Sequence, residues 1–137
     1  MTGWPKPDAL EPVGATLALE AQNAKETNLL TTLSDAAALS LAINRPNVRV
    51  VADTYHLHEA REAFDVVAAS VSEIAHVHVS DSDRQLPGEG DYDFATFFET
   101  LASHHYRQGL SIEMMREVTD DEMLRALAFV RDAVPPG

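Results

Sequence analysis

Short apolar runs alternate with longer amphipathic segments along the chain from about residue 16. The runs have the length and the small or branched side chains of strands, and they cover residues 16–20, 48–53, 74–79 and 110–113. The segments between them carry apolar residues at helical spacing and predict helices over residues 34–43, 59–72, 94–104 and 121–134. Strands that alternate with helices form βα units, in which the strands are parallel. The pattern therefore predicts an α/β fold of consecutive βα units.

Local signals predict the ends of these helices and of the domain. Ser34 and Asp120 are the predicted N-caps of the first and last helices, and Pro135 and Pro136 end the last one. Residues 1–15 hold three prolines and predict an irregular N-terminal arm, so the βα domain is assigned to residues 16–137. Apolar stripes on the first and last helices are expected to face the core. They comprise Leu39, Ala42 and Ile43 in the first helix and Met123, Leu124, Leu127 and Val130 in the last.

Composition and charge narrow the class of protein. The 137 residues include no cysteine, which excludes disulfides, thiolate metal sites and cysteine nucleophiles. With 22 acidic against 10 basic residues the formal net charge is -12, so a nucleic-acid partner is not expected. The N-terminal residues do not resemble a signal peptide, and no apolar stretch approaches the roughly 18 residues that a membrane span needs. We therefore expect a soluble, cytoplasmic protein.

A polar residue that can bind a metal lies at or next to the end of each predicted strand. These residues are Glu20, Asp53, His78 and Glu113. Strand alternation puts each on the face opposite the apolar residues that are expected to pack against helices. In parallel barrels the carboxyl ends of the strands meet at one edge, so ligands from four strands can converge there.

The joint pattern favours a metal site, although each residue alone has a simpler explanation. A single Glu or Asp at a strand end usually faces solvent or caps the next helix. Three carboxylates and an imidazole that converge would repel one another, and their proton affinities would rise unless a divalent cation neutralised them. An oxygen-rich ligand set with one nitrogen favours Mn²⁺ or Mg²⁺, and Co²⁺ and Zn²⁺ also accept such ligands.

Five motifs follow one another along the chain. They are Leu19-Glu20 with Asn23 and Glu26-Thr27, Asp53-Thr-Tyr-His56, His76-Val-His78-Val-Ser-Asp81, Arg84 with Pro87-Gly88-Glu-Gly90, and Ser111-Ile-Glu113. Their order and spacing resemble the xylose-isomerase-like TIM-barrel superfamily, which includes sugar isomerases and epimerases and AP endonuclease family 2-like proteins. The resemblance covers about residues 17–114 and implies the C-terminal half of a TIM barrel, a (β/α)4 half-barrel of parallel strands.

The resemblance also implies a function. A divalent metal, most often Mn²⁺, would be held by Glu20, Asp53, His78 and Glu113. Glu20 and Glu113 would transfer protons beside a metal-polarised carbonyl, and His56 and Arg84 would contact substrate oxygens. The implied enzyme is a divalent-metal-dependent isomerase or epimerase of a small keto-sugar or related polyol ketone. A DNA-repair endonuclease of the same superfamily fits less well, because it would need more metal ligands and a basic surface.

A half-barrel leaves its two outer strands without a neighbour. A complete barrel has eight strands and about 250 residues, so strands 16–20 and 110–113 would present unpaired edges. We expect self-association into a homodimer, or a separate N-terminal half-barrel, to cover these edges; in an excised piece the sheet would stay open. The alternative function is a catalytically incomplete metal-binding half-barrel that serves as an assembly or interaction module.

Overall fold

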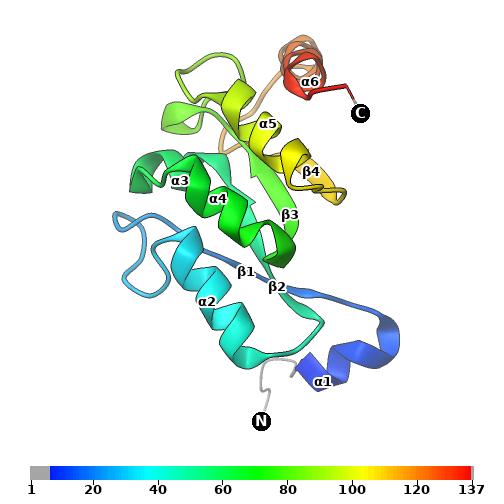
Figure 1. Cartoon of the computed structure of the whole chain (residues 1–137). Coiled ribbons are helices and arrows are strands. Elements are labelled where there is room, and N and C mark those ends of the chain that lie inside the picture. The colour runs from blue at the N-terminus through cyan, green and yellow to red at the C-terminus, as the bar shows by residue number, and fades with distance from the viewer. Residues whose placement is uncertain (1–6, 137) are drawn as a thin grey trace.

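Four parallel strands form one sheet in the computed structural model, which describes residues 7–136 (Figure 1). The strands are β1 (Leu17–Glu20), β2 (Val48–Asp53), β3 (Ile74–Val79) and β4 (Gly109–Ile112). They lie in the order β1-β2-β3-β4, so each strand pairs in parallel with the next strand of the chain. The predicted strands and the parallel α/β class are therefore confirmed.

The main helices lie on one side of this sheet (Figure 1). They are α2 (Leu33–Ile43), α3 (Thr54–Ala60), α4 (Phe64–Ser70), α5 (Phe94–Ser103) and α6 (Asp120–Ala133). Short helical turns are α1 (Pro7–Leu10), η1 (Glu11–Val13), η2 (Val71–Glu73) and η3 (Ser82–Arg84). The described part of the predicted irregular arm is thus mostly helical, and residues 1–6 lie outside the described residues. Within residues 7–136 no helix has the length and apolar character to cross a membrane.

The N-terminus of α2 is held by side chains from two places in the chain. Its N-cap is Thr32, whose hydroxyl accepts a hydrogen bond from Asp35 N at 3.1 Å, so the prediction of Ser34 as the N-cap is wrong. The Glu62 carboxylate accepts hydrogen bonds from Leu33 N at 2.7 Å and from Ser34 N at 3.2 Å. These acceptors satisfy the first N–H groups and place negative charge at the positive end of the helix dipole, which starts the helix at Leu33.

The last helix has a different N-cap from the predicted Asp120. The Thr119 hydroxyl accepts a hydrogen bond from Glu122 N at 3.3 Å, and the Glu122 carboxylate accepts one from Thr119 N at 2.7 Å. This reciprocal capping box satisfies two N–H groups at once. Asp120 becomes the first residue of α6 and adds negative charge to its first turn.

The helix predicted over residues 59–72 is wrong, because two helices, α3 and α4, follow β2. Asp53 Oδ1 accepts hydrogen bonds from Tyr55 N at 2.8 Å and from His56 N at 3.2 Å, which starts α3 immediately after the strand. Arg61 ends α3 in a left-handed conformation with φ of 54°. The first turn of α3 therefore lies directly at the carboxyl end of β2.

The core lies between the sheet and the helices that cover it. Val50 and Ala52 of β2, Val77 of β3 and Phe97 of α5 are each at most 1% exposed. The apolar face predicted for the strands is therefore the face that packs against helices. The other face carries the polar strand residues, including His76 and His78, and both of these are only half-buried.

The apolar stripes predicted for the first and last helices are mostly not in the core. On α2 the buried residues are Leu33, Ala36, Ala37 and Ser40, whereas the predicted Leu39, Ala42 and Ile43 are exposed. On α6 Val130 is buried, as predicted, and Met123 is half-buried, but Leu124 and Leu127 are 63% and 50% exposed. Apart from Leu33 in the first turn, the buried side chains of α2 are small and allow close approach to the sheet, and the other larger apolar residues lie on other faces.

Candidate metal centre

Four side chains that can bind a metal converge at the carboxyl ends of the strands. Glu20, Asp53, His78 and Glu113 each offer one ligand atom, and these atoms lie within 4.8 Å of one another. His78 Nδ1 lies 2.8 Å from Glu20 Oε1, 3.4 Å from Glu113 Oε2 and 3.8 Å from Asp53 Oδ2. The residues that the sequence singles out as ligands are therefore brought together.

The register of the sheet produces this convergence. Glu20 and Asp53 are the last residues of β1 and β2, and Asp53 is the register partner of His78 in β3. Glu113 directly follows β4 and continues the ladder, since its N–H donates to Val79 O at 3.1 Å. The strand order places Glu20 and Glu113 at the two ends of a row, with Asp53 and His78 between them.

Asp53 is the most buried of the four, with a side chain that is 0% exposed. Its Oδ1 caps α3, whereas Oδ2 is buried and has no hydrogen-bond donor among residues 7–136. Burial, and then hydrogen bonding of the protonated carboxyl with Glu113, raise the pKa of Asp53 to about 8. A buried carboxylate oxygen without a donor, surrounded by other carboxylates, is the environment that a divalent cation would stabilise. The residues present fit such an ion.

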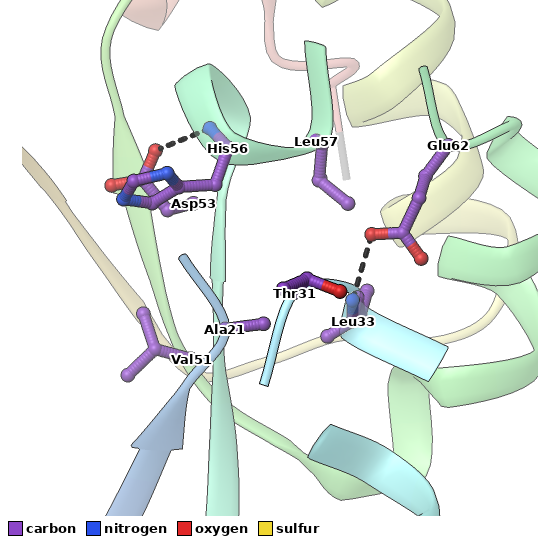
Figure 2. Close-up of a pocket in the computed structure, with 8 residues that line it drawn as sticks. All are labelled: Ala21, Thr31, Leu33, Val51, Asp53, His56, Leu57 and Glu62. Carbon is purple, nitrogen blue, oxygen red and sulfur yellow. Dashed lines mark hydrogen bonds between the residues drawn. The ribbon is translucent and has the colours of Figure 1, made fainter. Parts of the chain in front are cut away.

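A second group of polar side chains lies beside these four residues and includes both predicted substrate-binding residues. The backbone N–H of His56 donates to Asp53, as Figure 2 shows. Arg84 Nη2 lies 3.4 Å from His56 Nε2 and donates to Glu26 at 3.0 and 3.2 Å. Burial, and then the positive charge of Arg84, lower the pKa of His56. Burial raises the pKa of Glu26, but hydrogen bonds from Asn23 and Arg84 outweigh it and lower that pKa overall.

The loop that carries Arg84 is organised by a buried carboxylate. Asp81 is 1% exposed and accepts hydrogen bonds from three backbone N–H groups, those of Ser82, Gly88 and Tyr92, each at 2.9 Å. Arg84 itself adopts a φ of 56°, a region that costs a non-glycine residue free energy. Its guanidinium carbon lies 4.3 Å from the centre of the Tyr55 ring. The loop thus holds the positively charged guanidinium of Arg84 in a defined place against α3 and the loop after β1.

Asp53 and His56 line a small cavity next to the loop after β1 (Figure 2). Its volume is about 10 Å³, and its lining also includes Ala21, Thr31, Leu33, Val51, Leu57 and Glu62. A space of this size is comparable to a single water molecule and is too small for a sugar. Within residues 7–136 the main helices lie on one side of the sheet (Figure 1), so a substrate of the cluster would approach from the other face.

The sequence pattern alone indicates no individual role for several residues of this region. Asn23, Glu26, Tyr55 and Asp81 stand out in the sequence only as parts of motifs. Their position in loops that directly follow strand ends is the signal that could have indicated a role, because such loops border the site in parallel barrels. Their contacts depend on loop conformations that periodicity does not predict.

Comparisons with known proteins agree with this geometry. The model of a family described as xylose isomerase-like TIM barrel matches residues 7–133. An L-ribulose 3-epimerase of Methylomonas sp. (strain DH-1) is 32% identical over 121 residues, which are 87% of this chain and 42% of that protein. A ketose 3-epimerase of Arthrobacter globiformis is 35% identical over 100 residues, which are 72% of this chain and 35% of that protein.

A solved structure gives the same result for the fold. The crystal structure of a D-allulose 3-epimerase from Methylomonas sp. has a TM-score of 0.86 and 28% identity, over 93% of this chain and 52% of that chain. The chain therefore spans about half or less of the length of these relatives, and its four parallel strands match part of a TIM barrel. These matches confirm the resemblance that the five motifs indicate.

Proposed function

The chain belongs to the xylose isomerase-like TIM barrel family, and on this premise we propose that it carries the metal centre of a divalent-metal-dependent sugar epimerase or isomerase. The observation that carries the proposal is the convergence of Glu20, Asp53, His78 and Glu113 within 4.8 Å. Because the similar proteins are named as 3-epimerases of ketoses, we favour epimerisation of a small keto-sugar or related polyol ketone over aldose–ketose isomerisation.

The ligand set supports a hard divalent cation. For three carboxylates and one imidazole, without sulfur, we propose Mn²⁺ as the bound metal, with Mg²⁺, Co²⁺ and Zn²⁺ as alternatives. When bound, the cation would polarise a substrate carbonyl and stabilise the negative charge that develops after proton loss. The residues that would hold it are the four of the cluster.

Glu20 and Glu113 are the proposed catalytic residues. They come from the outer strands, and their side chains are 26% and 36% exposed, whereas that of Asp53 is 0% exposed. A substrate on the uncovered face of the sheet can therefore contact both glutamates. One carboxylate would take the proton from the carbon next to the carbonyl, and the C–H electron pair would enter a planar enediolate. The other glutamate, protonated beforehand, would return a proton to the opposite face of that carbon.

His56 and Arg84 are the proposed substrate-binding residues. The His56 ring and the Arg84 guanidinium lie beside the cluster, and Arg84 is held in place by Glu26 and by the Tyr55 ring. Donors that are held in place before the reaction stabilise developing negative charge on a substrate oxygen. We expect the two residues to orient the substrate oxygens and to stabilise the enediolate.

Exchange of solvent deuterium into ketoses tests this function. The protein is loaded with Mn²⁺ and incubated with a panel of ketoses in D₂O, and the carbon next to the carbonyl is followed by NMR. For a pair of epimeric ketoses we expect exchange of both with wild type, loss of exchange from at least one with Glu113→Gln, and wild-type exchange with Glu117→Gln, a matched change at an exposed glutamate. Wild-type exchange of both epimers in Glu113→Gln would contradict the proposed role of that residue.

We also propose that a second half-barrel covers the edges of β1 and β4. These strands each pair on one side only within residues 7–136, and unpaired edges attract further strands. Either a second copy of this chain or a separate N-terminal half-barrel would close the sheet. Light scattering at micromolar concentration tests the homodimer, and a mass equal to one chain would exclude it.

The alternative function is a metal-binding module for assembly or interaction that does not turn over substrate. The feature that supports it is the sheet of residues 7–136, whose four strands match only part of a TIM barrel. This function predicts that Mn²⁺ binds and raises the melting temperature while no ketose exchanges deuterium.

A further inference from the structure

Asn23, in the loop after β1, contacts His56 with two different nitrogen atoms. Its backbone N–H donates to His56 Nδ1 at 3.1 Å, and its side-chain Nδ2 lies 3.0 Å from the same ring nitrogen. Asn23 and His56 are only 1% and 5% exposed, so the contacts are shielded from water. A backbone amide can only donate, so His56 Nδ1 must be the acceptor and carries no proton.

The orientation of the Asn23 amide follows from its other partners. Its Oδ1 accepts a hydrogen bond from Lys25 N at 3.0 Å, and a backbone N–H can only donate. Its Nδ2 donates to Glu26 Oε1 at 3.0 Å, which leaves the second Nδ2 proton for His56. Exchanging the oxygen and nitrogen of this amide would lose all three hydrogen bonds, so the side chain has one orientation.

A neutral imidazole with an unprotonated Nδ1 carries its proton on Nε2. We infer that Asn23 is a positioning residue that holds His56 in the Nε2–H tautomer, so that this N–H and Arg84 together donate to one acceptor oxygen of the substrate. The identity of that acceptor rests on the proposed function, whereas the tautomer rests only on the contacts of Asn23.

The position of Arg84 supports a shared acceptor. His56 Nε2 and Arg84 Nη2 lie 3.4 Å apart, and both are donors in this arrangement, so they cannot bond to each other. A carbonyl or hydroxyl oxygen that lies between them would accept from both. Glu26 links Arg84 to Asn23, because its carboxylate accepts hydrogen bonds from both residues. The amide of Asn23 thereby connects the histidine and the arginine through one hydrogen-bond network.

The charge of the surroundings favours the neutral ring. Burial and the nearby Arg84 lower the pKa of His56, although Glu26, Glu20 and Glu113 act in the opposite direction. A doubly protonated ring would also point an Nδ1 proton at two donors of Asn23. The neutral Nε2–H form of His56 is therefore the form that is compatible with both donors of Asn23.

Histidine NMR tests the tautomer without any need for activity. Two-bond ¹⁵N–¹H correlation spectra of protein labelled at its six histidines report which ring nitrogen carries the proton. The signals of His56 are assigned by their loss in His56→Gln. We expect Nε2–H in the wild-type protein. A wild-type His56 that carries its proton on Nδ1 would overturn the inference.

A variant pair tests whether Asn23 is the cause. Asn23→Asp keeps the backbone N–H that donates to His56 Nδ1 but replaces the side-chain donor with an acceptor, so we expect a fraction of the His56 rings to carry their proton on Nδ1. Asn28→Asp makes the same charge change at an exposed position of the same loop and should leave the wild-type tautomer. An unchanged tautomer in Asn23→Asp, or the same shift in both variants, would overturn the role of Asn23.

Kinetics separate the positioning role from a general structural one. In metal-loaded protein we expect kcat/KM for the ketose to fall roughly 10- to 100-fold in Asn23→Asp, below the 10²- to 10³-fold loss typical of removing a donor outright. The dissociation constant for Mn²⁺ should stay at the wild-type value. If the wild-type protein shows the Nε2–H tautomer but exchanges no ketose proton, the proposed function fails and the tautomer assignment stands.

Discussion

The change of Asp53 to asparagine tests whether an ionised carboxylate destabilises the fold when no metal is bound. The Asp53 side chain is 0% exposed, and its Oδ2 has no hydrogen-bond donor within residues 7–136. Burial is the largest cause that raises its pKa to about 8, and Glu113 and Glu20 add to it. Asparagine keeps the shape and the Oδ1 cap of α3, carries no charge, and offers an N–H to the neighbouring carboxylates.

The raised pKa has a definite sign for stability. Below about pH 4 the carboxyl group is protonated in the folded and the unfolded chain, and its stabilising effect is fully present. As the pH rises toward 8 the unfolded chain ionises first, so the metal-free fold loses stability. From about pH 5.5 to about pH 8 this loss is on the order of 3 kcal/mol. For a domain of this size that corresponds to roughly 10 °C in melting temperature.

Thermal melts in EDTA at these two pH values measure the effect in wild type and Asp53→Asn. We expect the asparagine variant to depend less on pH and to melt above wild type at the higher pH. Asp65→Asn, at an exposed position of α4, is the control and should change stability by no more than about 0.5 kcal/mol. Comparison of the variants cancels the contribution of the other titrating groups.

Addition of Mn²⁺ should reverse the order of the two melting temperatures at the higher pH, so that wild type melts above Asp53→Asn. At about 100 times its dissociation constant a metal stabilises the fold by about 2.7 kcal/mol, and only wild type has the complete ligand set. A metal-free wild type that gains stability from about pH 5.5 to about pH 8, relative to Asp53→Asn, would refute the reasoning. So would an asparagine variant that melts below wild type in EDTA at the higher pH.

Three further changes test features that hold the site. Glu62→Gln weakens the acceptor for the first N–H groups of α2 and should lower the free energy of unfolding in urea by about 1–2 kcal/mol; an unchanged midpoint would contradict this. Gly88→Ala puts a Cβ 2.8 Å from Phe129 Cδ2 at a φ of +93° and should cost about 2 kcal/mol or more, whereas Gly14→Ala, with nothing within 4 Å, should cost only about 1 kcal/mol. Equal costs would show that the contact does not matter. Asp81→Asn removes the charged acceptor of three N–H groups and should speed amide exchange in residues 82–92 but not in β2; unchanged exchange would exclude its role in the loop.

The ligand cluster could be predicted because it depends only on the strands. Alternation along a strand decides which face a side chain occupies, and parallel pairing brings the carboxyl ends to one edge. Both conditions can be seen in short apolar runs that end in Glu20, Asp53 or Glu113. The exact pairing of Asp53 with His78 could not be predicted, because β3 starts opposite Val50 and the register shifts between Val50 and Val51.

The helix starts could not be predicted as well, because their caps come from distant parts of the chain. Glu62 reaches Leu33 across 29 positions, and no local signal indicates that contact. Asp53 has two uses, since it ends a strand and caps a helix, and the resulting α3 is absent from the periodic pattern. The prediction that the apolar stripes of α2 and α6 face the core was mostly wrong for another reason. The helical period shows that an apolar face exists, but not which of several apolar faces meets the sheet.

The two parts of the site should therefore respond differently to change. The four candidate ligands are positioned by backbone pairing of adjacent strands, which tolerates changes in the loops. His56 and Arg84 are fixed by hydrogen bonds within loops, from Asn23 to the histidine and from the arginine to Glu26. Loop substitutions should thus impair contacts with substrate oxygens before they impair metal binding. The four described strands also contain the whole candidate cluster, because carboxylate oxygens of Glu20 and Glu113 lie 2.8 and 3.4 Å from His78 Nδ1. For this reason metal binding is the property of the proposed enzyme that depends least on the rest of a barrel, and substrate selection is the property that depends on it most.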